Sequence, residues 1–156
     1  MKATTTDGRA IDLDPAVFDG LKSAVRGALF LEGSPAYEES RSVWNAMIDR
    51  RPAAVVRCLG AADVLAGMRF ARERDLLLCM KGGGHNIAGL AIADGALLPG
   101  LSPMRGVWVD ERARVARAQS GCTLGDVDRE TQLHGLAAVL GFVSATGIAG
   151  LTLGGG

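Results

Sequence analysis

Three consecutive glycines followed by a histidine, Gly82 to His85, end an apolar stretch of the sequence. Glycine has no Cβ, so neighbouring backbone N–H groups can turn to one side of such a loop and bind a polyanion such as a pyrophosphate. The imidazole of His85 lies at the edge of the loop and is its only nucleophile. The pattern favours a loop that binds a phosphorylated ligand next to a reactive side chain.

The loop does not match the two common phosphate-binding fingerprints. The dinucleotide pattern requires a glycine at the position of Ile87. The P-loop requires a lysine directly after a glycine, and this chain has Leu90 after Gly89. A plain glycine-rich turn, with His85 bonded to nearby backbone, explains the loop equally well when the loop is taken alone. A second glycine-rich run, residues 141–156, favours a ligand, because its small and hydroxyl residues suit a backbone lying flat against an extended molecule.

Composition excludes several other classes of protein. The 156 residues are 48% hydrophobic, enough for the core of one domain or part of one. Lys plus Arg and Asp plus Glu number 17 each, so no net charge attracts nucleic acid or an anionic membrane. The sequence shows no signal peptide and no apolar stretch long enough to cross a bilayer. We therefore expect no nucleic-acid or membrane partner and a cytoplasmic location, with the oligomeric state left open.

The first part of the chain, residues 1–50, predicts a helical lead-in. Asp14 and Pro15 form an N-cap with proline at the first helical position, and apolar residues recur at helical spacing as far as Ala28. Gly33 would end this helix. The polar residues 34–51 predict a loop with short turns.

The second part, from residue 51 onward, predicts a strand, a helix and a second strand. The β-branched residues 53–57 and the apolar residues 76–80 flank a helix over residues 61–74. A crossover of this length suits parallel pairing of the two strands. The glycine loop would then leave the carboxyl end of the second strand. The residues that we expect the helix to bury are Val64, Leu65, Met68 and Ala71.

Beyond the glycine loop, the pattern predicts two strands over residues 107–109 and 113–118. Thr123 and Asp126 form a capping box for a helix that ends at His134. We interpret His134 as a residue that interacts with the dipole at that helix end rather than as a catalytic group.

The remaining reactive and aromatic residues favour structural roles. Trp44 and Trp108 are more typical of a core or an interface than of a stacking platform for nucleic acid, because no basic cluster accompanies them. The cysteines lack Cys-x-x-Cys spacing and lie among apolar or small neighbours, so we expect buried thiols with no disulfide and no metal site. The cysteines are Cys58, Cys79 and Cys122.

Taken together, the motifs resemble the N-terminal part of FAD-linked oxidases with a PCMH-type FAD-binding domain, of the vanillyl-alcohol oxidase and berberine bridge enzyme type. The glycine-glycine-histidine loop after a strand is the most specific motif. The resemblance implies an α+β fold: a small strand-helix-strand subdomain and the start of a second mixed sheet. It places the FAD-binding domain at residues 51–156, incomplete at its C-terminus. The other matching segments are Tyr37 and residues 43–45, 51–58, 71–74, 101–107, 125–128 and 141–156.

The resemblance also implies how FAD is held. The loop from Lys81 to Gly89 would wrap the pyrophosphate, and a ring nitrogen of His85 would bond to the 8α-methyl carbon of the flavin. Such a bond retains the cofactor and raises its reduction potential. Relatives with a second, cysteinyl bond carry a cysteine where this chain has Val143, so only the histidyl bond is expected. The implied cofactor-binding residues are Lys81, Gly82, Gly83, Gly84, His85, Asn86, Ile87, Gly89, Ser144, Thr146, Gly147 and Gly150.

The chain departs from the family pattern in one strand. The family has an acidic residue where this chain has Leu98-Pro99-Gly100, and the proline predicts a short, edge or broken strand.

The family moves a hydride from an alcohol, sugar or related small molecule to the flavin and passes the electrons to dioxygen. Its substrate-binding parts follow the terminal glycines, so we assign no catalytic residue and expect FAD binding without turnover by these residues alone. A non-catalytic remnant with weak or no flavin binding, or a binding module for another phosphorylated ligand, are the alternatives.

Overall fold

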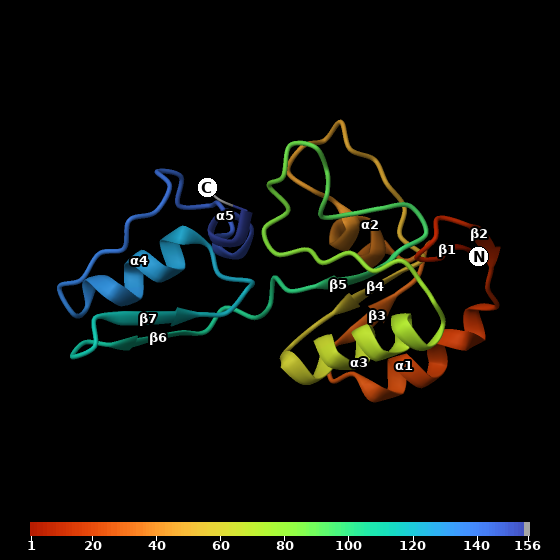
Figure 1. The fold of residues 1–156 in the computed structure, drawn as a ribbon, viewed down its shortest axis with the longest axis horizontal. Coiled ribbons are helices and arrows are strands. Elements are labelled where there is room, and N and C mark those ends of the chain that lie inside the picture. Colours follow the sequence, from red (N-terminus) through yellow and green to blue (C-terminus); the bar gives the residue numbers. More distant parts are fainter. Residues whose placement is uncertain (155–156) are drawn as a thin grey trace.

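Two short, buried, parallel strands, β4 (Ala54–Arg57) and β5 (Leu97–Gly100), form the centre of the larger of two lobes (Figure 1). The computed structural model describes residues 1–154. Strand β3 (Ala28–Phe30) pairs antiparallel with the other edge of β4, which gives the order β3-β4-β5. Every residue of β5 is buried, as expected for a parallel strand covered on both faces.

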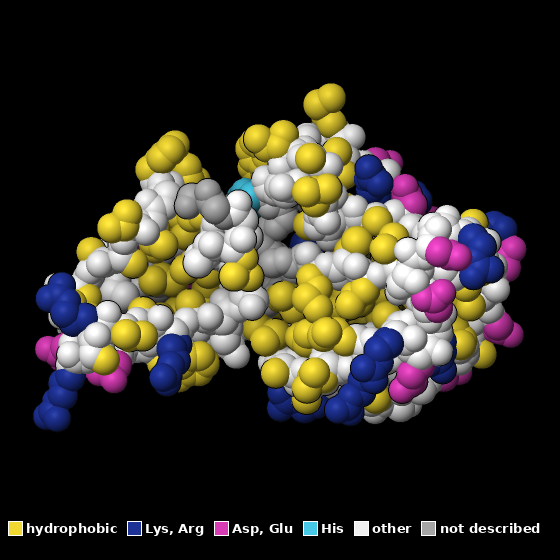
Figure 2. All heavy atoms as spheres, viewed as in Figure 1, with side chains coloured by type: hydrophobic (Ala, Val, Ile, Leu, Met, Phe, Trp, Pro, Cys, Tyr) yellow, Lys and Arg dark blue, Asp and Glu magenta, His cyan; other side chains and the backbone are white. Residues whose placement is uncertain are grey.

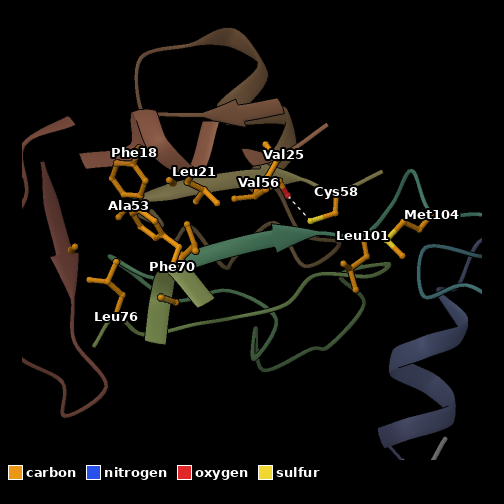
Figure 3. Packing of buried hydrophobic residues seen from close by; sticks show 14 residues of the cluster. Phe18, Leu21, Val25, Ala53, Val56, Cys58, Phe70, Leu76, Leu101 and Met104 are labelled. Carbon is orange, nitrogen blue, oxygen red and sulfur yellow. Dashed lines mark hydrogen bonds between the residues drawn. The ribbon is translucent and has the colours of Figure 1, made fainter. Parts of the chain in front are cut away.

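Helices cover both faces of this sheet (Figure 1). Helices α1 (Asp19–Ala24) and α3 (Ala61–Glu73) lie together on one face, and α2 (Pro35–Arg41) lies on the other. Between the sheet and the first pair, the Phe18 and Phe70 rings stack with centroids 5.2 Å apart (Figure 3). Burying an aromatic or large aliphatic side chain contributes about 1.5–3 kcal/mol, so this cluster is a main source of the lobe's stability.

A second apolar cluster lies on the α2 side of the sheet. Tyr37 is fully buried there against Val55 and Leu98. Its hydroxyl donates a hydrogen bond of 2.7 Å to the Pro52 carbonyl, which satisfies its polar atom. Burial raises the pKa of the Tyr37 hydroxyl to about 12, so it stays a neutral donor at ordinary pH. Tyr37 therefore attaches α2 to the strand that begins after Pro52.

The predicted helix from Pro15 to Gly33 is wrong in its second half. A 3-10 turn over Pro15–Phe18 continues into α1, which ends at Ala24, and Ala28 begins β3. A Cβ on Gly27 would lie 1.7 Å from the Arg57 carbonyl oxygen, so glycine is required for the close approach to β4. Residues 28–30 pair with β4 although the apolar spacing before them is helical, because helix propensity is weaker than the interactions of the tertiary structure. Residues 34–51, predicted as loop and turns, contain the short helix α2.

The predicted second strand, residues 76–80, does not pair with β4, because β5 lies between them. Leu78 and Lys81 instead form isolated parallel bridges to β5. Leu97 and Leu101 donate backbone hydrogen bonds to this segment, at 2.8 Å each. Pro99, between them on the same edge, has no N–H to donate, and the ladder is interrupted there. Strand β5 is thus short, as predicted, and it is the last strand of the three-stranded sheet, with an interrupted ladder to residues 77–81 on its outer side.

Helix α3 has the predicted extent, and of the four residues expected on its buried face Ala71 is buried and Val64 packs against the core. Leu65 and Met68 are 50% and 41% exposed, whereas the buried residues include a carboxylate, Asp63. The Asp63 carboxylate accepts N–H groups from Arg26 at 2.9 Å and from Leu59 at 2.8 Å. These bonds attach the start of α3 to the turn before β3. The residues buried by α3 are Asp63, Gly67, Phe70 and Ala71.

The smaller lobe consists of a hairpin and two helices. The predicted hairpin is confirmed: β6 (Val107–Asp110) pairs antiparallel with β7 (Val115–Ala118). Helix α4 (Leu124–Gln132) packs against it, and α5 (Ile148–Gly154) lies beside the larger lobe (Figure 1). The chain starts with an antiparallel hairpin of β1 (Lys2–Thr4) and β2 (Ala10–Asp12). The division at residue 50 stays a prediction, although β3 and β4 share one sheet.

Asp126 connects the parts of the smaller lobe. The predicted capping box is present, because Thr123 and Asp126 each bond the other's backbone. The Asp126 carboxylate also receives two hydrogen bonds from Arg105, at 2.9 and 2.7 Å. Burial raises the pKa of this carboxyl, but hydrogen bonds from the Thr123 N–H and Arg105 outweigh burial and hold the pKa below its ordinary value. The ionised carboxylate thus joins α4 to the connection between the lobes.

We expect Asp126→Asn to lower the free energy of unfolding by about 2 kcal/mol at pH 7, because charge-assisted hydrogen bonds are lost. A pKa that folding lowers contributes stability above the unfolded value, about pH 4, and loses it as pH falls through the folded value. Urea unfolding should therefore show a difference at pH 7 that shrinks below about pH 4. Asp128→Asn on the same helix is the control, and an equal loss in both variants would contradict the role of Asp126.

Candidate functional site

The two glycine-rich runs meet at Gly83 and Gly147, which are far apart in the sequence. A Cβ on Gly83 would lie 2.7 Å from the Gly147 Cα, and a Cβ on Gly147 would lie 2.7 Å from the Gly83 Cα. Real Cβ atoms do not approach other atoms so closely, so this contact of main chain with main chain requires glycine on both sides. It joins the larger lobe to the smaller one. The two lobes are separated by a notch in the view of Figure 2.

The smaller lobe holds the second glycine run by backbone hydrogen bonds. The N–H groups of Leu124 and Gly125, at the start of α4, donate to the carbonyls of Thr146 and Ser144, at 2.9 Å each. The Ile148 N–H donates to the Cys122 carbonyl at 2.9 Å. The capping box that begins α4 therefore also positions the run that contacts Gly83.

The first glycine run presents a series of unbonded backbone donors. Within residues 1–154, the N–H groups from Gly82 to Ala88 have no hydrogen-bond partner. Gly84 and Gly89 have φ values of +68° and +73°, which other residues rarely adopt. No Asp or Glu occurs in this segment. Consecutive main-chain donors without an internal acceptor are what an anion-binding loop provides.

Lys81 fixes the start of the loop to neighbouring elements of the larger lobe. Its backbone N–H donates to the Pro99 carbonyl at 3.0 Å, so this N–H belongs to the sheet. Its ammonium donates to the carbonyl of Ser42 at 2.8 Å and also to that of Ser40, at the C-terminal end of α2. Burial lowers the pKa of the Lys81 ammonium. Lys81 thus fixes the base of the loop to α2.

His85 lies at the edge of the loop and is half-buried. Its ring stacks on Trp44, with centroids 6.2 Å apart and planes inclined by 26°. Its ring nitrogens have no hydrogen-bond partner among the described residues. Trp44 is 67% exposed, so it is not a core aromatic, and its expected place in an interface stays a prediction. A lone tryptophan outside a basic cluster offered no sequence signal for this role.

The other expected site residues differ in their surroundings. The Asn86 side chain accepts the Leu90 N–H at 3.1 Å and shapes the loop itself. Ile87 is 75% exposed, and Gly150 lies in α5. His134 lies in the smaller lobe after α4, with its Nδ1 3.5 Å from a carboxylate oxygen of Glu111. The structure therefore brings together the two glycine runs and leaves His134 apart from them.

Two of the cysteines, Cys58 and Cys122, are buried as expected from the sequence, and Cys79 is partly buried. All three are free, and burial raises the pKa of each thiol, to about 11 for Cys58. No group of His, Cys, Asp and Glu side chains within residues 1–154 could hold a metal ion. No helix in the same part of the chain is long and apolar enough to cross a membrane.

Comparison with known proteins identifies the family to which the chain belongs. Residues 52–156 match the model of a family described as FAD binding domain, which is more than half of the chain. The chain belongs to this family of FAD-binding domains. An FAD-linked oxidoreductase of Dictyostelium discoideum is 36% identical over 134 residues, which cover 85% of this chain and 29% of that protein. The (R)-6-hydroxynicotine oxidase of Paenarthrobacter nicotinovorans is 32% identical over 133 residues, with the same coverage.

Solved structures confirm the expected α+β fold of a PCMH-type FAD-binding domain. The crystal structure of 6-hydroxy-D-nicotine oxidase from Arthrobacter nicotinovorans has a TM-score of 0.79 and 28% identity, covering 90% of this chain and 30% of that one. The berberine-bridge-enzyme-like protein 1 of Physcomitrella patens has a TM-score of 0.80 at 22% identity, covering 88% and 30%, and shows likeness of fold. This FAD-binding domain thus spans about 30% of the length of such structures.

We expect Gly147→Ala to lower the free energy of unfolding of this FAD-binding domain by about 1–3 kcal/mol, because its methyl group would displace Gly83. Urea denaturation measures the change. Gly20→Ala is the control, since nothing lies within 4 Å of a Cβ there. The control should be as stable as the original or up to about 1 kcal/mol more stable, because alanine favours the helix. Unchanged stability of Gly147→Ala would show that the lobes separate freely at this contact.

Proposed function

We propose that this domain binds FAD between its lobes, with the pyrophosphate on the backbone donors of the loop Gly82 to Ala88. The observation that carries the proposal is this uninterrupted run of unbonded N–H groups beside the contact of Gly83 with Gly147. A pyrophosphate supplies the acceptors that these donors lack within the described chain. The absence of acidic side chains from the loop removes the main source of repulsion.

Each residue named from the sequence then has a distinct role in the proposal. The glycines keep the main chain accessible to phosphate oxygens, and Lys81 holds the loop at its base. Ser144, Thr146 and Gly147 border the site from the smaller lobe. FAD supplies the electron acceptor for oxidation chemistry when it is bound.

His85 is the proposed covalent anchor of the flavin. Both ring nitrogens lack a hydrogen-bond partner within residues 1–154, so a lone pair is accessible in the neutral ring. The stacked Trp44 restricts the orientation of that ring. A second, cysteinyl bond is not proposed, because Val143 stands at the matching position and the described cysteines lie elsewhere.

For the whole protein, we propose a flavin-dependent oxidoreductase that oxidises a small molecule such as an alcohol or a sugar, with dioxygen as the electron acceptor. Relatives support this class: one is named for the oxidation of 6-hydroxynicotine, and a protein of similar fold is described as a glucose dehydrogenase.

The covalent anchor is tested by acid precipitation of the purified chain after incubation with FAD. We expect a yellow protein whose flavin stays in the precipitate, because a covalent bond survives unfolding. His85→Ala should release its flavin into the supernatant yet still bind FAD reversibly, since the phosphate contacts come from the main chain. His134→Ala is the matched control and should keep the bond. Flavin released by the original chain would contradict the anchor, and no FAD binding at all would contradict the whole proposal.

The role of the loop backbone is tested by Gly84→Val. Valine rarely adopts a φ of +68°, so the loop should rearrange and FAD binding should fall at least tenfold. Gly8→Val imposes comparable strain at a φ of +84°, in the N-terminal hairpin and far from the loop. Equilibrium dialysis with FAD compares the two variants in a His85→Ala background, where FAD binding is reversible. Equal FAD affinity in Gly84→Val and Gly8→Val would favour a plain structural turn.

A further inference from the structure

Residues 40–48, which we call the clamp, contact the glycine loop along its length. Lys81 binds carbonyls at the start of the clamp. The Trp44 N–H donates to the Gly84 carbonyl at 3.0 Å, and the Asn45 side-chain amide donates to the Ile87 carbonyl at 2.9 Å. At the far end, a Cβ on Gly89 would lie 2.7 Å from a side-chain carbon of Ile48. A segment that the sequence marks only as polar lead-in therefore follows the loop from end to end.

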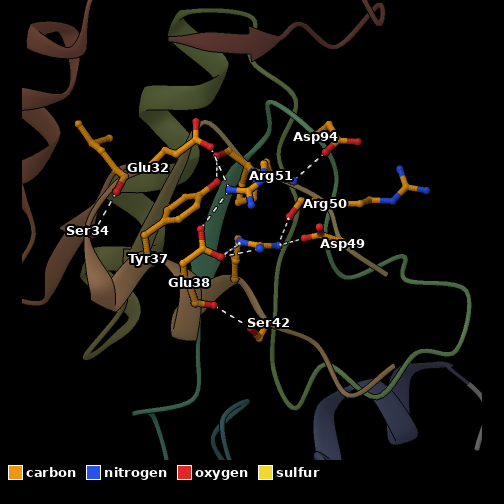
Figure 4. Close-up of polar contacts among 12 residues, drawn as sticks. Glu32, Ser34, Tyr37, Glu38, Ser42, Asp49, Arg50, Arg51 and Asp94 are labelled. Atoms are coloured by element: carbon orange, nitrogen blue, oxygen red, sulfur yellow. Dashed lines mark hydrogen bonds and ion pairs between the residues drawn. The ribbon is translucent and has the colours of Figure 1, made fainter. Parts of the chain in front are cut away.

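Arg41, near the start of the clamp, binds the two residues that directly follow its end, Asp49 and Arg50, which are labelled in Figure 4. Its guanidinium is 11% exposed and contacts the Asp49 carboxylate at 2.5 Å. The same group donates to the Arg50 carbonyl at 3.1 Å and binds Glu38 within α2 at 2.6 Å. An arginine can make several such bonds at once because its donors have a fixed planar arrangement. The clamp is thus a closed loop anchored on α2 rather than a free connection.

The clamp bonds determine which way the loop's donors point. In a planar trans peptide, the carbonyl and the following N–H point in opposite directions. Fixing the Gly84 carbonyl toward Trp44 turns the His85 N–H away from the clamp. Fixing the Ile87 carbonyl toward Asn45 does the same for the Ala88 N–H. Both N–H groups belong to the unbonded run described above, so the clamp keeps them available for a ligand on the other side.

Asn45 can fix the Ile87 carbonyl because its side-chain amide contains both a donor and an acceptor, and both are bonded. Its Nδ2 donates to the Ile87 carbonyl, while its Oδ1 accepts the Met47 N–H at 3.2 Å within the clamp. An ionised carboxylate of the same shape could accept from Met47 but could not donate to Ile87. Asn45→Asp would therefore place a carboxylate oxygen against the Ile87 carbonyl oxygen. Because both are acceptors, the clamp would separate from the loop at this point.

We propose that Asn45 is a positioning residue for cofactor binding: through the clamp it holds the glycine loop with its N–H groups directed at the pyrophosphate before the ligand arrives. This inference rests on the proposed FAD binding. Preorganisation of this kind raises affinity because the loop does not have to be ordered on binding. Asn45 itself touches no part of the ligand in this proposal and acts only through the Ile87 peptide.

The test compares Asn45→Asp with the original residue in a His85→Ala background, where FAD binding is reversible. Gln132→Glu, at the end of α4, makes the same chemical change far from the clamp and is the control. Two quantities are measured: the dissociation constant for FAD by titration, and the fast motion of the amides from Gly84 to Ala88 by nitrogen-15 relaxation without FAD. We expect at least tenfold weaker binding and lower order parameters in Asn45→Asp, with Gln132→Glu unchanged in both.

Each outcome decides a different point. If the His85→Ala background binds no FAD, the proposed function fails, and the relaxation data still show whether Asn45 orders the loop. If the background binds FAD and Asn45→Asp binds it equally well, the positioning role is wrong, whatever the loop motion. Weaker binding with unchanged loop motion also overturns the proposal, because the loss would then come from the added charge and not from the clamp. Gln132→Glu measures what such a charge does elsewhere on the surface.

Discussion

The contact between the main chains of Gly83 and Gly147 is the constraint on which the arrangement of the site depends. Two polypeptide backbones can approach this closely only where both residues lack a Cβ. The contact brings a loop from the larger lobe against a run from the smaller one, and each lobe contributes main-chain groups in place of long side chains. A site built in this way suits an extended, charged ligand that needs many small contacts along its length.

In the larger lobe, the sheet determines the position of the loop that contains Gly83. Strand β5 lies between β4 and the segment that leads to the loop, and Lys81 bonds to β5 through its backbone and to α2 through its ammonium. The loop therefore starts from a position fixed by two elements. Within the loop, Gly84 and Ile87 are held by the clamp, and residues 86–88 are exposed. Family membership is consistent with this construction, since the match begins at residue 52 and includes the loop.

In the smaller lobe, helix α4 determines the position of the glycine run that contains Gly147. The capping box of Thr123 and Asp126 fixes the start of α4, whose first N–H groups hold the carbonyls of Ser144 and Thr146. Asp126 also binds Arg105 in the connection between the lobes. One carboxylate therefore links the connection, the helix and the second glycine run. Exposed apolar residues remain on this lobe, among them Phe142, which is fully exposed.

The sequence by itself determined the elements whose signals are local. The extent of α3, the β6–β7 hairpin and the capping box at Thr123 follow from periodicity and from hydrogen bonds between near neighbours. The glycine loop and its histidine are likewise visible as a motif, because glycine there is a requirement of the main chain.

Only the tertiary structure decided which distant segments meet. It made residues 28–30 a strand, placed β5 rather than residues 76–80 beside β4, and brought Gly147 to Gly83. It also paired Asn45 with Ile87, 42 positions further along the chain. Helical and strand periodicities describe which side of an element is apolar and carry no information on its partner. Partners are selected by packing and by the pairing of backbone groups across the whole fold, which no local pattern records.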